Sequence, residues 1–174
     1  NVAQTVTRII TVVDTTVPVI TLDGGTQVTH EAGFAYLDAN ASWSDAVDGR
    51  GVVYASGEVN ASDPGVYVLG YDYADAAGNV AQTVTRTITV VDTTVPVITL
   101  DRTTVVSGKR GDSACGGNDR WSDAAAGSGV VYFRGDVTAS DPGVNALSYE
   151  YQDATGHVSL TVTRKDIVVY THCS

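Results

Sequence analysis

The sequence predicts an all-β protein that consists of two tandem sandwich domains built from antiparallel strands. Three observations predict this fold: short runs rich in Val and Thr, turn residues between those runs, and one long segment that occurs twice. No stretch of the 174 residues shows sustained apolar side chains at helical spacing. Branched side chains such as Val and Thr fit the pleated surface of a sheet, so this composition is typical of an all-β chain.

The repeated segment gives the number of domains. Residues 1–23 read NVAQTVTRIITVVDTTVPVITLD, and residues 79–101 differ from them at a single position. The shift is 78 positions, and the same shift carries Trp43 onto Trp121 without an insertion. A constant interval of this size indicates tandem modules.

The repeat also sets the predicted boundaries. We expect residues 1–13 to be the last strand of a preceding repeat, residues 14–91 to be the first module, and residues 92–174 to be a diverged second module. The linker between modules is the short segment DTTVP. A linker this short restricts bending.

Turn residues divide the first module into short strands. Pro18 fits the start of the first strand, because an edge position needs no backbone N–H. Turn signals then follow at Gly24-Gly25, Asp48-Gly49, Asp63-Pro64-Gly65 and Gly78-Asn79. Runs rich in Val, Thr, Tyr and Ile lie between them, and this spacing is typical of an antiparallel sandwich.

The penultimate strand, residues 66–73, indicates which face is buried. Alternate positions of a strand share a face, and one face here carries Tyr67, Leu69, Tyr71 and Tyr73. The second copy keeps Leu147, Tyr149 and Tyr151 on that face, with Asn145 in place of the first tyrosine. We therefore assign this face to the core and expect each tyrosine hydroxyl to bind a backbone partner at the rim.

Charge and composition exclude several classes of protein. The net charge is −10 and the pI is about 4.4, whereas nucleic-acid phosphates require clusters of Lys and Arg. No apolar run is long enough for a membrane-spanning helix. The three histidines, His30, His157 and His172, lie on different segments, so we predict no enzyme active site.

Four motifs in order carry a resemblance to a known family. They are VVDTTVPVITL at the junction, SDAVDG in mid-module, SDPGVY at a strand opening and YADAAGN before the last strand. Together they resemble bacterial-type surface immunoglobulin-like modules and are similar to the hyalin-repeat group. The resemblance implies an immunoglobulin-like sandwich of the kind used in stalks, adhesin spacers and filaments.

Cysteines and sequons are the covalent candidates. Cys115 and Cys173 both lie in the second module, and a disulfide between them would stabilise it by roughly 4 kcal/mol in the chain-entropy model. The alternative is a pair of free thiols. The sequons at Asn40 and Asn60 predict glycan sites if the source is a eukaryote, and such triplets also arise by chance.

Acidic loops at one end of the first module predict a metal site. The linker residue Asp14 should enter near the last hairpin, which holds Asp75 and Asn79, and near the loop that holds Asp45 and Asp48. Converging carboxylates suit Ca²⁺, which takes six to eight oxygen ligands. The alternative is that Asp75 and Asn79 only hydrogen-bond their own hairpin backbone.

Two functions remain open from the sequence. The first is an extracellular spacer in a cell-surface stalk, surface layer or filament, whose partners are neighbouring modules and like subunits. The second is an adhesin or carbohydrate-binding module that recognises its ligand through the segment from Gly111 to Gly117. Residues 1–13 either end an upstream module or complete a sandwich in a neighbouring subunit by strand addition.

Overall fold

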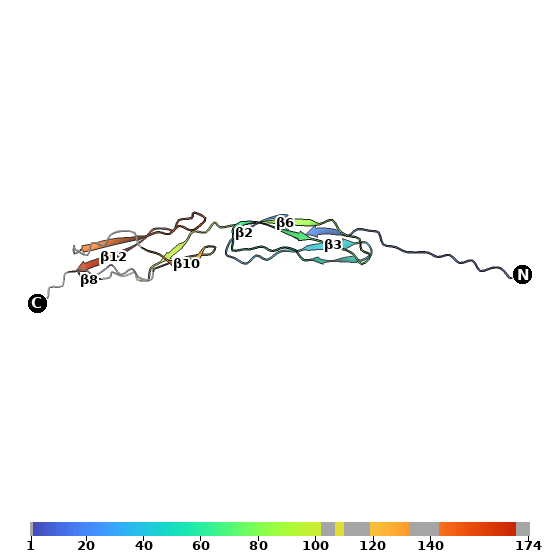
Figure 1. The fold of residues 1–174 in the computed structure, drawn as a ribbon, viewed down its shortest axis with the longest axis horizontal. Helices are drawn as coiled ribbons and strands as arrows, with labels where there is room; N and C mark the ends of the chain where they lie inside the picture. Colours follow the sequence, from blue (N-terminus) through green and yellow to red (C-terminus); the bar gives the residue numbers. More distant parts are fainter. Residues whose placement is uncertain (1, 102–106, 110–118, 133–142, 170–174) are drawn as a thin grey trace. The chain divides into compact units, whose positions relative to one another are not determined.

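The computed structural model of the chain describes residues 2–101, 107–109, 119–132 and 143–169 (Figure 1). These residues form strands and connecting segments, and no helix able to cross a membrane occurs among them. In chain order the strands are β1 (Val19–Leu22), β2 (Gln27–Glu31), β3 (Ala41–Asp45), β4 (Gly49–Val53), β5 (Gly65–Tyr71), β6 (Val84–Val91), β7 (Val97–Thr99), β8 (Ser107–Lys109), β9 (Arg120–Asp123), β10 (Gly127–Val130), β11 (Gly143–Tyr149) and β12 (Val162–Val169). The all-β prediction is confirmed, and the strands are consistent with an immunoglobulin-like sandwich.

The chain divides into two compact units. Unit 1 consists of Asn1–His30, Tyr36–Asn60 and Gly65–Thr89, and unit 2 consists of Glu31–Ala35, Ala61–Pro64 and Val90–Ser174. The boundaries predicted from the repeat, 14–91 and 92–174, stay a prediction.

The strands of the first half form two sheets of three strands, with the orders β1-β3-β4 and β2-β6-β5. In the first sheet β3 pairs antiparallel with both neighbours, and Trp43 lies opposite Ile20 on one side and Gly51 on the other. Buried side chains come from both sheets, which is how a sandwich forms its core. They include Ile20, Ala41, Val53, Leu69, Tyr71 and Ile88.

Strand β5 buries the face that the sequence assigned to the core. Leu69 and Tyr71 are buried, whereas Val66 and Val68 on the opposite face are 68% and 56% exposed. Alternate burial along a strand is the expected result when one face of an antiparallel sheet meets the core. The face assignment is therefore confirmed for this strand.

Unit 2 contains two further sheets, with the orders β10-β9-β7 and β11-β12-β8. Strands β11 and β12 pair antiparallel, and the short strand β8 pairs parallel to β12. The buried cluster of this unit consists of Ile98, Val131, Leu147 and Tyr149.

Four pairs of corresponding strands begin 78 positions apart, whereas β9 begins 79 positions after β3 and β8 begins 80 positions after β2. Strand β4 begins at Gly49 and β10 at Gly127, and β5 and β11 begin at Gly65 and Gly143. Strands β6 (Val84–Val91) and β12 (Val162–Val169) agree with the shift of 78 positions at both ends. Local sequence therefore sets the same strand limits twice.

Residues 2–13 form no strand in this structure. Their large apolar side chains are exposed, among them Val2 (100%), Ile9 (92%) and Val12 (91%). A strand requires a neighbouring strand to receive its backbone hydrogen bonds. The expectation that residues 1–13 act as a last strand requires such a partner from elsewhere, and it stays a prediction.

Candidate functional site

Three of the predicted acidic residues of unit 1 lie together. Asp14 precedes β1, Asp45 ends β3, and Asp75 lies in the turn between β5 and β6. One carboxylate oxygen from each lies within 4.8 Å of the other two. These three residues are called the unit 1 cluster below.

Short-range hydrogen bonds hold Asp14 and Asp45. Oδ1 of Asp14 accepts from the backbone N–H of Thr16, 3.0 Å away, and the Thr16 hydroxyl lies within hydrogen-bond distance of both carboxylates. Oδ1 of Asp45 accepts from the N–H groups of Asp48 and Val47, and these bonds lower the pKa of Asp45 because they favour its ionised form. Oδ2 of Asp14 is buried and has no hydrogen-bond partner within the described part of the chain.

Asp75 and Asn79 close their own hairpin. The N–H of Asn79 donates to Oδ1 of Asp75 at 2.7 Å, and its side-chain amide donates to Oδ2 at 2.8 Å. The backbone N–H of Asp75 donates to the carbonyl of Asn79. The turn-stabilising role is therefore present, and calcium binding by the unit 1 cluster stays a prediction.

Asp48 takes a different position from the three clustered carboxylates. Its Oδ2 accepts from the N–H of Ala76 at 2.7 Å. Asp48 thus connects the turn after β3 to the turn after β5 within unit 1.

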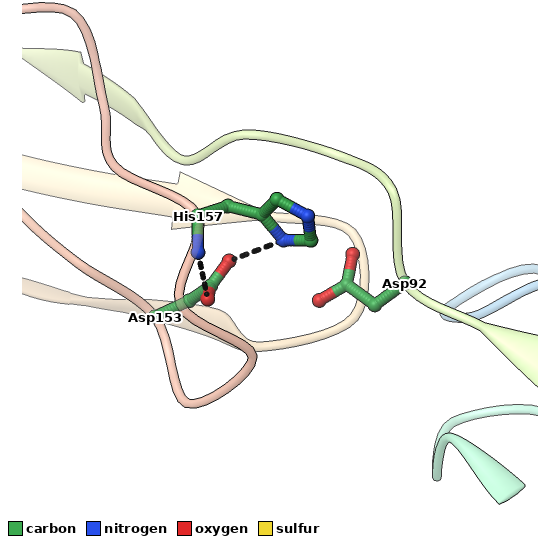
Figure 2. Close-up of side chains that lie close together, drawn as sticks. All are labelled: Asp92, Asp153 and His157. Carbon is green, nitrogen blue, oxygen red and sulfur yellow. Dashed lines mark hydrogen bonds and ion pairs between the residues drawn. The ribbon is translucent and has the colours of Figure 1, made fainter.

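Unit 2 contains a matching cluster at the same interval. Asp92, Asp153 and His157 correspond to Asp14, Asp75 and Asn79, and one ligand atom from each lies within 4.8 Å of the others. Figure 2 shows the carboxylate of Asp92, on the segment between β6 and β7, facing the pair formed by Asp153 and His157 in the turn between β11 and β12. These three residues are called the unit 2 cluster below.

Asp153 is the most buried member of the unit 2 cluster. Its side chain is 0% exposed, and Oδ1 accepts from the N–H groups of Thr155 and His157, each at 2.9 Å. Burial raises the pKa of Asp153, but the hydrogen bonds from Thr155, His157 and Gly156 outweigh it and the net pKa is lowered. The carboxyl group is therefore held in its ionised form.

Each unit also has a buried arginine that the sequence analysis did not single out. Arg86 on β6 is 1% exposed, and its guanidinium donates to the carboxylate of Asp38 and to the carbonyls of Gly25, Asp23 and Asn40. The hydroxyl of Tyr71 donates to Oδ2 of Asp38 at 2.7 Å. The expectation of a backbone partner for this hydroxyl was therefore wrong, because a buried carboxylate is the stronger acceptor.

The arginine of unit 2 has a partner from a different sequence position. Arg164 donates to Oδ2 of Asp119 at 3.2 Å, and both side chains are 1% exposed. Arg164 corresponds to Arg86 in the repeat, but Asp119 corresponds to Ala41 and not to Asp38. The alternation of Arg86 with the buried residues Ile88 and Val90 was the available sequence signal for an inward-facing arginine.

The tryptophans pack against aromatic and glycine neighbours. Trp43 stacks on Tyr73 with ring centroids 4.0 Å apart, and Trp121 stacks on Tyr151 at 3.9 Å. Gly51 lies so close to the indole of Trp43 that an added Cβ would be 2.6 Å from Nε1. Both indole rings therefore take part in side-chain packing.

The structure does not test the predicted disulfide, the glycan sites or the recognition segment. Cys115, Cys173 and the segment from Gly111 to Gly117 lie outside the described residues. Asn40 has a positive φ of 65° and Asn60 is exposed. The disulfide, both glycan sites and the recognition segment stay predictions.

Comparison with known proteins gives one family. Residues 20–90 match the family described as "Bacterial surface protein, Ig-like domain". The matched segment is less than half of the chain, and for that segment it supports an immunoglobulin-like domain with a location at the cell surface. The likeness to the hyalin-repeat group stays a prediction.

Among solved structures, a lipoprotein shows limited similarity. The lipoprotein BT2262 from Bacteroides thetaiotaomicron aligns with 84% of this chain and 80% of its own chain, at 13% identity and a TM-score of 0.38. A likeness of this degree says nothing about function. No curated protein matches the chain.

Proposed function

We propose that the chain is an extracellular spacer: two tandem immunoglobulin-like modules that hold other parts of a surface protein apart. The match of residues 20–90 to a surface immunoglobulin-like domain supports the location. The recurrence of strand limits after 78 positions supports the tandem arrangement. A stalk, surface layer or filament all use modules in this way, and neighbouring modules are the expected partners.

The hydrogen bonding of the linker carries the proposal. Oε1 of Glu31 accepts from the N–H of Thr93 at 2.7 Å, and Oε2 accepts from its hydroxyl at 2.8 Å. The hydroxyl of Thr94 lies 2.9 Å from a carboxylate oxygen of Asp92 and 2.9 Å from one of Asp123. All of these residues belong to unit 2, so the bonds fix consecutive linker residues against that unit and remove backbone freedom there.

The proposal includes no catalytic role. Asp153, His157 and Thr155 resemble a catalytic triad in composition, but the hydroxyl of Thr155 and the carboxylate of Asp153 both face Nδ1 of the imidazole. A catalytic triad needs the nucleophile on one ring nitrogen and the carboxylate on the other, so that the proton can move from nucleophile to base. The three side chains are therefore arranged to stabilise the turn, and the Thr155 hydroxyl is not placed to act as a nucleophile.

The length of tandem chains tests the spacer function. Chains with one, two and three copies of the 78-residue repeat would be measured by small-angle X-ray scattering. A semi-rigid spacer should add a constant increment to the maximum dimension for each copy. In a matched series, Thr93→Gly and Thr94→Gly remove the linker contacts, and the increment should become smaller with each added copy.

Two outcomes would contradict the spacer function. The first is a native series whose dimensions follow those of the glycine series, since the linker contacts would then have no effect on stiffness. The second is saturable binding of a glycan to the two-copy chain in a glycan array, which would favour the adhesin.

A further inference from the structure

The unit 2 cluster contains a buried carboxylate oxygen that lacks a hydrogen bond. Asp153 is 7% exposed, and no donor among the described residues forms a hydrogen bond with its Oδ2. Nδ1 of His157 lies 3.4 Å from this oxygen, and the two form an ion pair only if the imidazole is protonated. An ionised oxygen removed from water without a partner is costly, so a positive charge is expected beside it.

The hydroxyl of Thr155 shows the same shortage of donors. It lies 3.0 Å from Oδ2 of Asp92, 2.8 Å from Oδ1 of Asp153 and 2.8 Å from Nδ1 of His157. A hydroxyl has one proton to donate, so even when Nδ1 of His157 carries the ring proton and donates to this hydroxyl, the hydroxyl can serve only one of the two carboxylates. In that neutral state Oδ2 of Asp153 still lacks a hydrogen bond, and a cation bound beside it would supply the missing positive charge.

We propose that Asp92, Asp153 and His157 bind a divalent metal ion of the zinc class. The three residues come from two segments of unit 2, the linker and the turn between β11 and β12, and their ligand atoms already lie within 4.8 Å of one another. Two ligands of a tetrahedral zinc ion are roughly 3.4 Å apart, since each bond is about 2.1 Å long. Asp92 is half-buried on the linker, and metal binding would require its carboxylate to shift by roughly 1 Å to reach that spacing.

The histidine determines which metal ion is preferred. Imidazole nitrogen suits Zn²⁺, whereas Ca²⁺ takes oxygen ligands only. Unit 1 has Asn79 at the corresponding position, and an amide gives no nitrogen ligand. The single exchange of Asn79 for His157 between the repeats therefore changes the cluster from an all-oxygen site to a mixed site.

Metal binding would fasten the linker to the turn. Asp92 begins the linker, and Asp153 and His157 close the turn between β11 and β12. One ion bonded to all three would replace the single contact between the Thr155 hydroxyl and Asp92. The site therefore acts within unit 2 and does not depend on the spacer function.

Zinc titration with a matched variant tests the site. The full chain, with its thiols alkylated, would be titrated with Zn²⁺ against a colorimetric chelator at neutral pH, beside His157→Asn, Asp92→Asn and the control His30→Asn. His157→Asn introduces the residue that unit 1 carries at this position, so it should fold. We expect about one bound ion per chain, affinity at least about ten-fold weaker in the two cluster variants, and no change in the control.

Three results would overturn the proposal. One is the absence of zinc uptake, another is equal affinity of the native chain and His157→Asn, and the third is displacement of zinc by a moderate excess of Ca²⁺. Nuclear magnetic resonance of the His157 ring separates the alternatives. Its signals should shift on addition of Zn²⁺, and a ring that responds only to pH would identify a protonated imidazole in place of the metal.

Discussion

At the scale of single residues, the buried guanidinium groups are the feature that most needs compensation, because a buried charge loses its water. Arg86 is surrounded by one carboxylate and three backbone carbonyls, and these replace the water that a charged group loses on burial. A buried ion pair adds little net stability, but removal of one partner leaves a charge unpaired. Asp38 is therefore a residue whose loss should be costly.

We predict that Asp38→Ala lowers the free energy of unfolding by about 3 kcal/mol, because it leaves the Arg86 charge without its carboxylate. Urea unfolding followed by circular dichroism measures the change. The control is Glu58→Ala, which removes an exposed carboxylate and should change stability by no more than about 0.5 kcal/mol. Equal effects of the two substitutions would contradict the prediction.

A second substitution should repair the first. Ala41→Asp, added to Asp38→Ala, places a carboxylate where unit 2 has Asp119, so part of the lost stability should return.

The pH dependence of stability gives a further check on the role of Asp38. Burial raises the pKa of Asp38, but bonds from Tyr71 and Arg86 outweigh it and the net pKa is lowered. The stability lost in Asp38→Ala is thus present above the unfolded pKa of about 3.9 and disappears as pH falls through the folded value.

Sequence reasoning at this scale found the acidic residues but not their ion-pair counterparts. Asp14, Asp45 and Asp75 were predicted to converge because the loops of a sandwich meet at its ends, and they do converge. Asp38 was not found, because it lies in a loop whose path depends on the folded core. The unit 2 cluster was not predicted, because the sequence analysis considered the acidic loops of the first module only.

At the scale of strands, the pairing of β3 with β4 in unit 1 and of β9 with β10 in unit 2 explains a glycine in each unit. Gly51 lies directly opposite Trp43, and Gly129 lies directly opposite Trp121. An aromatic side chain over a glycine on the neighbouring strand covers backbone that would otherwise be open. The indole also stacks on Tyr73, so the ring has contacts on both sides in unit 1.

We predict that Gly51→Ala destabilises unit 1 by about 2 kcal/mol, since the new methyl group would push the indole off Tyr73. Thermal unfolding and tryptophan fluorescence report the loss. The matched control is Gly65→Ala, whose added carbon would meet Tyr67 at an ordinary distance of 3.7 Å. If the two variants unfold at the same temperature, the close approach of strand and ring has no energetic importance.

Strand limits were more predictable than strand partners. The turn signals at Asp48-Gly49 and Gly78-Asn79 correspond to turns in the structure, because φ at these glycines is 91° and other residues rarely adopt that value. The parallel pairing of β8 with β12 had no sequence signal, since it joins segments that are far apart along the chain. Residues 2–13 show the same limit: they differ from residues 80–91, which contain β6, at one position only, but they form no strand here.

At the scale of the whole molecule, each unit has its own buried cluster and one tryptophan. We predict two unfolding transitions, reported separately by Trp121→Phe and Trp43→Phe chains through the tryptophan that remains. In the Trp121→Phe chain, whose remaining Trp43 reports unit 1, Gly51→Ala should shift the transition to a lower denaturant concentration. In the Trp43→Phe chain, whose remaining Trp121 reports unit 2, Gly51→Ala should leave the transition unchanged. A common shift in both chains would show that the units unfold as one.

The two positions of the ion-pair carboxylate limit how the gene for this chain can change. Recombination between repeats readily lengthens or shortens a tandem array, and most crossover points join equivalent residues. A crossover between positions 38 and 41 differs, because one product inherits both Asp38 and Asp119 while its reciprocal inherits Gly116 and Ala41. The second product would leave its arginine charge uncompensated, so viable hybrids should exchange sequence on either side of these residues and not between them.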